Sequence, residues 1–399
     1  MAADPRLSKL VFVVFADDWG RHPSSCQHLF RRIVPHAQVL WVNTIGLRVP
    51  RLNVHDIARS IEVLRGWLTP NPPAGGTQPP DAGDAVDSPI AAAPEVLRPV
   101  MWPWFQRRWL AALNQRLLSH AVAKGLARSA PGKQAILVST VPIVPGLFSQ
   151  PRFLKKVYYC VDDFTEWDGV DGKAIRRMEM ETLKACDLLI AASTPLLNSR
   201  GPLVRRAALM THGVDVDHFA TATPDPASPL AVLPHPIVGM FGLFDRRVDA
   251  ALLAAAARGL PAATFAVVGP LVDRSPEEFG DLPNLRFFGA VPYSELPGHA
   301  AHFDVCILPY VVDATTHSIN PLKLKEYLAT GKPVVATPLP EAVALGEYVM
   351  VAPPGRFAQE LERAVVNPPP RSPSLRPFLN GESWDAKATR FLDEVLRGL

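Results

Sequence analysis

Apolar runs of a length typical of buried strands recur along the whole chain, separated by polar turns. Residues 10–15 read LVFVVF, and such continuous runs are typical of parallel strands covered on both faces. We expect the other strands at residues 39–42, 135–138, 157–160, 187–192, 237–241, 264–268, 285–289, 305–309 and 334–336. Helical stretches, such as residues 27–33 and 174–185, alternate with them. The alternation predicts an α/β chain with two Rossmann-like halves.

A chain of 399 residues is long enough for two domains, each with its own core. The proline-rich run at residues 221–236 is the natural linker, so we place the first domain at residues 1–220 and the second at residues 237–380. Residues 69–98 are rich in Pro, Gly, Ala and Asp and hold almost no large apolar side chains. Because burial there cannot offset the entropy lost on ordering, we expect a disordered insertion.

Composition argues against several classes of protein. The 41 Lys and Arg are scattered among 38 Asp and Glu, whereas nucleic-acid-binding proteins usually concentrate their positive charge. Cys26, Cys160, Cys186 and Cys306 form no Cys-x-x-Cys pair, which indicates buried free thiols in a reducing cytosol rather than a zinc or disulfide framework. No run approaches the roughly 18 apolar residues of a membrane-spanning helix. We therefore expect a cytoplasmic protein that is soluble or lies on the cytoplasmic face of a membrane, without a nucleic-acid partner.

The stretch at residues 317–337, HSINPLKLKEYLATGKPVVAT, predicts a short helix that leads into an inner strand. Asn320 or Ser318 can cap its start, because a side-chain oxygen there accepts a hydrogen bond from a free backbone N–H. Pro321 suits the first helical position, and Gly331 can adopt the left-handed turn that ends a helix.

Two charged side chains of this predicted helix are candidate ligand contacts. The free N–H groups at its front, the helix dipole and Lys323 together favour an anion such as a diphosphate. Glu326 could accept hydrogen bonds from vicinal hydroxyls such as those of a ribose. The alternative is an ordinary amphipathic helix whose lysine and glutamate are solvated.

The stretch resembles the signature of the large retaining group of GT-B glycosyltransferases (group 1, family 4-like), whose second domain carries Glu-x7-Glu before a Gly-Lys-Pro-Val-Val turn and strand. Glu326 matches the second glutamate, which holds the donor ribose in that family, and residues 331–335 match the turn and strand. The first glutamate, which lies near the donor sugar and diphosphate in the family, is replaced by Ser318. The resemblance therefore implies a donor site that includes Ser318, Asn320, Lys323 and Glu326.

The resemblance also implies an architecture and a reaction. GT-B enzymes have two Rossmann-like domains whose parallel sheets face a central cleft, and their last helix, here residues 381–399, returns to the N-terminal domain. Members are hexosyltransferase-like enzymes that move a sugar, with retention of its anomeric configuration, from a nucleoside diphosphate sugar to a saccharide or lipid-linked acceptor. Polysaccharide or glycolipid biosynthesis is the implied process, and no metal or cofactor is expected besides the nucleotide sugar.

Two acidic loops follow expected strands of the first domain, at the sheet edge where doubly wound folds bind ligands. In the loop at residues 17–22, Asp18 either holds acceptor hydroxyls or caps the following helix. The loop at residues 161–167 contains Asp162 and Asp163. We expect Asp163 to bind the acceptor or take its proton rather than to ligate a metal, because no third carboxylate lies at a recognisable spacing.

The second domain adds weaker donor-site candidates. Gly242 follows the expected strand at residues 237–241, and a glycine there lets the backbone approach a ligand. Arg246 and Arg247 either pair with phosphate oxygens of the donor or are solvated charges at the start of a helix. Val291 follows another strand, at the place where the backbone contacts the base in the resembled family.

Residues 101–110, MWPWFQRRWL, place three tryptophans and a phenylalanine beside two arginines. Trp and Arg together suit contact with a lipid-linked acceptor or a membrane surface. The alternative is that these rings pack under the insertion at residues 69–98.

Two rival functions remain open from the sequence. A sugar-nucleotide-binding subunit without activity is suggested by Ser318 at the position of the first glutamate. A nucleotide-sugar epimerase on the same fold would need acidic and basic groups around the sugar, which the sequence does not place.

Overall fold

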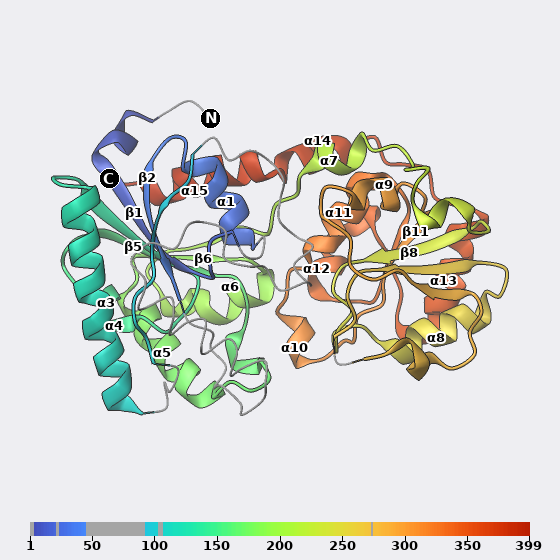
Figure 1. Cartoon of the computed structure of the whole chain (residues 1–399), viewed down its shortest axis with the longest axis horizontal. Helices are drawn as coiled ribbons and strands as arrows, with labels where there is room; N and C mark the ends of the chain where they lie inside the picture. The colour runs from blue at the N-terminus through green and yellow to red at the C-terminus, as the bar shows by residue number, and fades with distance from the viewer. Residues whose placement is uncertain (1–3, 21–23, 45–91, 103–106, 273) are drawn as a thin grey trace. The chain divides into compact units, whose positions relative to one another are not determined.

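The chain folds into two compact units in the computed structural model, which describes residues 4–20, 24–44, 92–102, 107–272 and 274–399 (Figure 1). The described residues of the first unit lie within 1–210 and 388–399, and those of the second unit are 211–387. Residues that follow Met210 belong to the second unit because they bond to the end of that unit. Val214 N–H donates to the carbonyl of Glu382 at 3.1 Å, and Trp384 N–H donates to the carbonyl of Val214 at 3.3 Å.

The first unit is built on a parallel sheet in the order β3-β2-β1-β4-β5-β6-β7, the Rossmann order with one further strand. Its strands are β1 Leu10–Ala16, β2 Gln38–Asn43, β3 Glu95–Leu97, β4 Gln134–Ser139, β5 Phe153–Cys160, β6 Leu188–Ala191 and β7 Ala207–Leu209. Its helices are α1 Ser25–Ile33, α3 Arg108–Ser129, α4 Pro145–Phe148, α5 Gly172–Ala185 and α6 Thr194–Arg200, with short 3₁₀ turns at Pro5–Lys9, Phe164–Glu166 and Gly201–Leu203.

Both faces of this sheet are covered, which explains why its strands read as continuous apolar runs. Alternate side chains of β1 enter two cores: Val11, Val13 and Phe15 pack with α3, α4 and α5, whereas Phe12 and Val14 pack with α1 and the C-terminal helix α15 (Trp384–Leu396). A strand that buries every side chain shows no polar alternation.

The last part of α15 belongs to the core of the first unit. The Phe391 ring lies 5.7 Å from Phe30 of α1 and 6.3 Å from Tyr159 of β5, centroid to centroid. Lys155 Nζ donates to the carbonyls of Val395 and Arg397 at 2.6 and 2.8 Å. A cation at the last carbonyls stabilises a helix C-terminus, so both packing and charge fix this end of α15.

The second unit repeats the arrangement with a parallel sheet in the order β10-β9-β8-β11-β12-β13. Its strands are β8 Ile237–Phe241, β9 Thr264–Val268, β10 Leu285–Phe287, β11 Val305–Leu308, β12 Val334–Ala336 and β13 Met350–Val351. Its helices are α7 Val216–Ala220, α8 Ala250–Gly259, α9 Leu296–Ala300, α10 Ala314–His317, α11 Leu322–Thr330, α12 Pro340–Val343, α13 Pro354–Val366, α14 Leu375–Gly381 and the start of α15, with 3₁₀ turns at Pro229–Val232, Pro276–Phe279 and Gly346–Tyr348.

The structure confirms the predicted strands and the α/β class with two Rossmann-like sheets, and it corrects other expectations. Part of the insertion predicted to be disordered, residues 69–98, lies outside the described residues. Its end is ordered instead, because β3 pairs with β2 along Leu40↔Glu95 to Val42↔Leu97. Of the tryptophan-rich stretch, residues 103–106 lie outside the described residues, whereas Trp102 and Trp109 are 38% and 64% exposed.

All four cysteines are buried and free, as predicted. Among the described helices, none is both long and apolar enough to cross a membrane.

Candidate functional site

Two glycines bring the ends of neighbouring strands into close contact in the second unit. Gly242 follows β8 with φ +114°, and Gly269 follows β9 with φ +149°. A Cβ atom on Gly269 would lie 2.0 Å from the Gly242 carbonyl oxygen, so only glycine fits there. The carboxyl ends of these parallel strands are the place where doubly wound folds bind ligands, and α11 begins at the same edge after β11.

Helix α11 begins at Leu322 with no capping side chain, which corrects the predicted start. Pro321 is the residue before the helix rather than its first helical residue, and Ser318 ends the preceding helix α10. The backbone N–H groups of Leu322 and Lys323 have no partner among the described residues. The prediction that Gly331 ends the helix in a left-handed turn is confirmed by its φ of +73°. The helix therefore presents free amides at its front, as an anion site requires.

Asn320 has a different partner from the one predicted. Its side-chain Nδ2 donates to Glu341 Oε2 at 2.6 Å, and its Oδ1 accepts from the His212 N–H at 3.3 Å. All three residues are buried. Asn320 therefore holds the segment before α11 in place, and it leaves the amides of the helix uncapped.

Lys323 and Glu326 form an ion pair one turn apart, with Nζ 3.1 Å from Oε2. Glu326 is buried, its Oε1 accepts from the Tyr293 hydroxyl at 3.5 Å, and its Oε2 has no hydrogen-bond partner among the described residues. The charge of Lys323 therefore compensates the burial of this oxygen, which receives no hydrogen bond from a described residue. If Lys323 turns to another anion, Oε2 becomes an acceptor for a ligand donor such as a hydroxyl.

The carboxyl end of β8 holds the helix that carries Lys323 and Glu326 in place. Lys323 Nζ lies 5.3 Å from the centroid of the Phe241 ring, a cation–π contact. On the buried side of α11, the Tyr327 hydroxyl donates to the Phe241 carbonyl at 3.0 Å and accepts from the Phe241 N–H at 3.1 Å. The helix is therefore fixed against the strand that precedes Gly242.

Gly242 leaves room for the Lys323 side chain, since a Cβ atom at Gly242 would lie 2.5 Å from Lys323 Cε. We expect Gly242→Ala to lower the free energy of unfolding by about 1–3 kcal/mol through backbone strain at positive φ, and to displace Lys323. Because the clash needs both side chains, Lys323→Ala should cost less in the Gly242→Ala background than in the wild type, as measured by urea unfolding of the four proteins. Gly280→Ala is the control, with φ +64° and open space around its Cβ. Equal costs of Lys323→Ala in both backgrounds would contradict the clash.

A buried cluster of charges lies on the other side of α11. Lys325 Nζ donates to Glu382 Oε2, to the His212 carbonyl and, at 2.8 Å, to Thr211 Oγ1. Lys387 Nζ donates to Glu382 Oε1 at 2.6 Å and to Thr211 Oγ1 at 2.9 Å. One carboxylate thus separates two buried lysines and ties α11 to residues at both borders of the second unit.

Burial in this cluster lowers the pKa of Lys325 to about 8, and the neighbouring charge of Lys387 acts in the same direction, against the attraction of Glu382. Burial alone would raise the pKa of Glu382, but the charges and hydrogen bonds of the two lysines outweigh it and bring that pKa below its ordinary value. The ionised form of Glu382 is therefore favoured in this cluster, whereas burial disfavours the charged form of Lys325.

The remaining donor-site candidates are spread around the same edge of the sheet. Arg247 pairs with Asp245, with Nη2 2.8 Å from Oδ2, and its guanidinium lies 5.9 Å from the Tyr310 ring centroid. Arg246 is exposed in the same loop. Val291 is partly buried against the core of the second unit. The role of Arg246 as a phosphate contact stays a prediction, and Asp245 already pairs with Arg247.

In the first unit, the aspartates of the loop after β1 have different surroundings. Asp17 accepts hydrogen bonds from Ser24 Oγ at 2.8 Å and Gln27 Nε2 at 2.6 Å, and burial raises its pKa. Asp18 is half-buried, and its carbonyl accepts from Gln27 Nε2 at 2.9 Å. Arg21 and His22 of the predicted loop lie outside the described residues. Asp17 therefore stabilises the start of α1 through its side chain, whereas Asp18 contributes its backbone carbonyl.

The Asp163 carboxylate is buried in an ion pair, with Oδ2 2.7 Å from Arg200 Nη2. Thr165 donates to Oδ1 from its hydroxyl at 2.6 Å and from its N–H at 3.2 Å. Burial alone would raise the pKa of Asp163, but the bonds from Thr165 and Arg200 and the charge of Arg200 outweigh it and lower that pKa. A carboxylate with a lowered pKa binds hydroxyl donors well and accepts a proton poorly.

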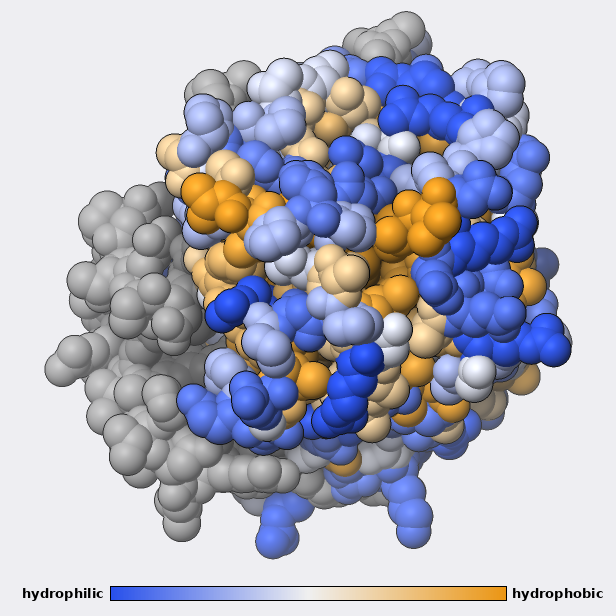
Figure 2. Space-filling model, turned by 90° about the vertical axis from the view of Figure 1, so that its right-hand side faces the viewer, coloured by the Kyte–Doolittle hydropathy of each residue, from blue (hydrophilic) through white to orange (hydrophobic). Residues whose placement is uncertain are grey.

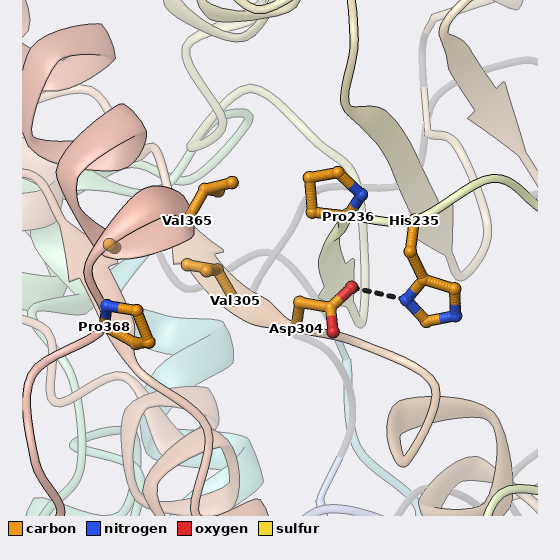
Figure 3. Close-up of a pocket in the computed structure, with 7 residues that line it drawn as sticks. His235, Pro236, Asp304, Val305, Val365 and Pro368 are labelled. Carbon is orange, nitrogen blue, oxygen red and sulfur yellow. Dashed lines mark hydrogen bonds and ion pairs between the residues drawn. The ribbon is translucent and has the colours of Figure 1, made fainter.

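A hollow lies elsewhere, at the amino ends of the strands of the second unit (Figure 3). It has a volume of about 370 Å³ and is lined by His235, Asp304 and Pro368 among others. His235 Nδ1 lies 2.6 Å from Asp304 Oδ2, and both side chains are substantially exposed. The free helix amides and the buried carboxylate lie away from this hollow, at the opposite, carboxyl ends of β8 and β11. The described residues also contain no group of three or more His, Cys, Asp or Glu that could hold a metal ion.

Sequence reasoning missed several residues that build the site. Tyr293 contacts Glu326, and its ring stacks on His218 with centroids 4.7 Å apart. Lys325 and Glu382 form the cluster behind the helix. The signal for Lys325 was present, because residues two apart on a helix do not share a face, so Lys323 and Lys325 have different surroundings.

Comparison with known proteins finds a family model that matches part of the chain. Residues 235–367 match the family model of glycosyl transferases group 1. TuaH of Bacillus subtilis (strain 168), described as a candidate teichuronic acid biosynthesis glycosyltransferase, is 26% identical over 292 residues, which are 69% of this chain and 72% of TuaH.

Solved structures resemble nearly the whole chain. Sucrose-phosphate synthase from Thermosynechococcus elongatus has a TM-score of 0.67 and 18% identity, covering 96% of this chain and 97% of the synthase. HepE of Anabaena, in complex with UDP and glucose, has a TM-score of 0.61 and 15% identity, covering 98% of this chain and 100% of HepE. The trehalose-6-phosphate structure from E. coli bound with UDP-2-fluoro glucose has a TM-score of 0.61 and 12% identity, covering 98% and 99%. Residues 235–367 are therefore similar to the glycosyl transferases group 1 family, and the chain as a whole has the α/β GT-B fold, with two Rossmann-like units.

Proposed function

We propose that this protein is a glycosyltransferase that moves a sugar from a nucleoside diphosphate sugar to a saccharide or lipid-linked acceptor, in polysaccharide or glycolipid biosynthesis. The family match of residues 235–367 and the likeness to TuaH support the reaction class. The observation that carries the proposal is the buried Glu326 carboxylate, whose Oε2 is ion-paired with Lys323 and receives no hydrogen bond from a described residue, beside the free amides of α11. A nucleotide sugar offers a hydroxyl pair and a diphosphate to these groups.

The donor binds along the front of α11 in this proposal. Its diphosphate accepts hydrogen bonds from the amides of Leu322 and Lys323, where the helix dipole favours negative charge, and Lys323 and Arg246 add their charges. As Lys323 turns to the diphosphate, both oxygens of Glu326 become available to the ribose hydroxyls. Val291 and Gly242 lie near this edge and supply backbone rather than charge.

The transfer step requires a nucleophile, a leaving group and a proton acceptor. An acceptor hydroxyl oxygen forms a bond to the anomeric carbon, the bond from that carbon to the diphosphate oxygen breaks, and the nucleoside diphosphate departs. We assign the hydroxyl proton to the departing phosphate, on the face of the sugar that gives retention, and the acceptor to the loops of Asp18 and Asp163. The lowered pKa of Asp163 favours binding of acceptor hydroxyls over uptake of the proton. Stabilising charge on the leaving diphosphate is the main electrostatic task, and no further cofactor takes part.

Release of nucleoside diphosphate from a panel of nucleotide sugars tests the proposal, with UDP sugars first, because UDP ligands are bound in HepE and in the E. coli structure. Acceptor-dependent release with a new glycoside is the expected result, and NMR of its anomeric configuration tests retention. Binding without turnover for every donor and acceptor would contradict the proposal and favour the inactive subunit suggested by Ser318. Conversion of the donor sugar to its epimer would identify an epimerase.

A further inference from the structure

One face of α3 in the first unit exposes apolar and cationic side chains together. Trp109 is 64% exposed and Leu113 is 37% exposed. Arg116, His120 and Lys124 are exposed and continue the same face at helical spacings of three and four residues. The opposite face is buried, with Leu110, Asn114, Leu118 and Val122 packed against the first unit. The exposed stripe from Trp109 to Lys124 is about 22 Å long at the rise of an α-helix.

The charge of this region is strongly one-sided. Between Glu95 and Asp162 the sequence contains ten Lys and Arg and no Asp or Glu, although the whole chain has a formal net charge of only +3. Arg116 and Lys124 form no ion pair with any described residue, whereas Arg128 at the end of the helix pairs with Glu95. The stripe therefore presents uncompensated positive charge beside exposed apolar groups.

Exposed apolar side chains also occur in the second unit, but their surroundings differ from those of the exposed stripe on α3. They include Val232 at 86% and Val366 at 76% exposure. On the face of that unit seen in Figure 2, hydrophobic side chains are interspersed with hydrophilic ones. Single exposed apolar residues are normal on a protein surface and need no partner. The α3 stripe differs because its apolar and cationic groups share one helix face without an acidic residue.

We propose that this face of α3 docks the protein on an anionic lipid membrane. Trp and Leu can enter the boundary between headgroups and acyl chains, and cations along the same face lie at the depth of anionic headgroups. Nucleic acid would use the cations but would leave Leu113 exposed. The inference goes beyond the proposed function, since it needs neither Glu326 nor a nucleotide sugar, and it places the enzyme at the surface that carries a lipid-linked acceptor.

Co-sedimentation of the full-length protein with vesicles, without any nucleotide sugar, tests the docking face. We expect binding to vesicles of phosphatidylcholine with about one third phosphatidylglycerol, little binding to pure phosphatidylcholine, and loss of binding in about 1 M salt, where charges are screened within a few ångströms. Trp109→Ala with Leu113→Ala should weaken partitioning about tenfold to a hundredfold. Arg116→Glu with Lys124→Glu should abolish it.

Matched variants in the second unit separate this face from general stickiness. Val232→Ala with Val366→Ala removes exposed apolar groups, and Arg258→Glu with Arg356→Glu reverses exposed charges elsewhere. Both controls should bind vesicles as the wild type does, and circular dichroism should show that every variant is folded.

Three results would overturn the proposal. The first is no binding of the wild type to anionic vesicles, and the second is equal binding by the α3 variants. The third is a loss of self-association or of nucleic-acid binding in the α3 variants with vesicle binding unchanged, which would assign the face to that other partner. Failure of the proposed glycosyltransferase activity would leave each of these vesicle results unaffected.

Discussion

Glu326→Ala is expected to lower kcat/KM for sugar transfer by about a hundredfold to ten-thousandfold. Hydrogen bonds to a charged group contribute about 1.5–3 kcal/mol each, a carboxylate can accept one from each of two ribose hydroxyls, and a tenfold change corresponds to about 1.4 kcal/mol. Donor binding should weaken in parallel, as measured by isothermal titration with the nucleotide sugar. The variant also loses the ion pair with Lys323 and the long bond from Tyr293, so urea unfolding should accompany the binding measurement to show that the variant is folded.

The chain offers graded variants for this experiment. Glu326→Gln keeps one acceptor oxygen and should recover part of the loss. Glu362→Ala removes an exposed glutamate from α13 of the same unit and should leave kcat/KM unchanged. Donor affinity that is the same in Glu326→Ala and the wild type would refute the assignment of the ribose to this carboxylate, even if the enzyme remained active.

The sequence was most informative about elements whose hydrophobic pattern directly reflects their burial in the folded protein. β8 and β9 were predicted at their observed bounds, because strands covered on both faces are uninterrupted apolar runs. β3, β7 and β13 are two or three residues long and half-buried, so they offer too few positions for a pattern. They lie at or near sheet edges, where pairing partners decide the conformation.

The candidate site was predictable in its position and less so in its details. Gly331 ends α11 as expected, since a left-handed residue is a local requirement. Asn320 has the chemistry of a cap, but it donates to Glu341, a partner 21 residues away that local reasoning cannot identify. Tertiary partners therefore overrode a local preference at the very residue that would have covered the helix amides, and the override is what leaves them available.

Lys323 and Lys325 also show that local sequence does not identify tertiary partners. Both are lysines of one short helix, yet Lys323 reaches Glu326 at the front whereas Lys325 is buried against Glu382. Helix geometry predicts that their surroundings differ, but which of the two faces is buried depends on segments far away in the sequence. The front of α11 is thus held from behind by charges that do not themselves meet the ligand.

Glu382→Gln is therefore expected to destabilise the protein by about 3–5 kcal/mol, the usual cost of removing one partner from a buried ion pair. The side chains of Lys325 and Lys387 are 5% and 2% exposed and would be left as neighbouring positive charges without their shared ion-pair partner. Urea unfolding measures the change. Glu360→Gln, which breaks the exposed pair with Arg363, is the control and should cost less than about 1 kcal/mol.

The double variant Glu382→Gln/Lys325→Met distinguishes unpaired charge from lost packing. If charge is the cause, removing one lysine should restore at least half of the lost stability, whereas lost packing would make the double variant less stable than either single one.

The pH dependence of stability has a definite sign as well. The pKa of Lys325 is about 8 in the folded protein and lies below its ordinary value of 10.5, so the unfolded chain holds more protons between these values. The Lys325 contribution to the free energy of unfolding should rise as pH increases from about 8 to 10.5, and Lys325→Met should remove that rise. An identical pH profile for the variant and the wild type would show that this buried lysine does not titrate with folding.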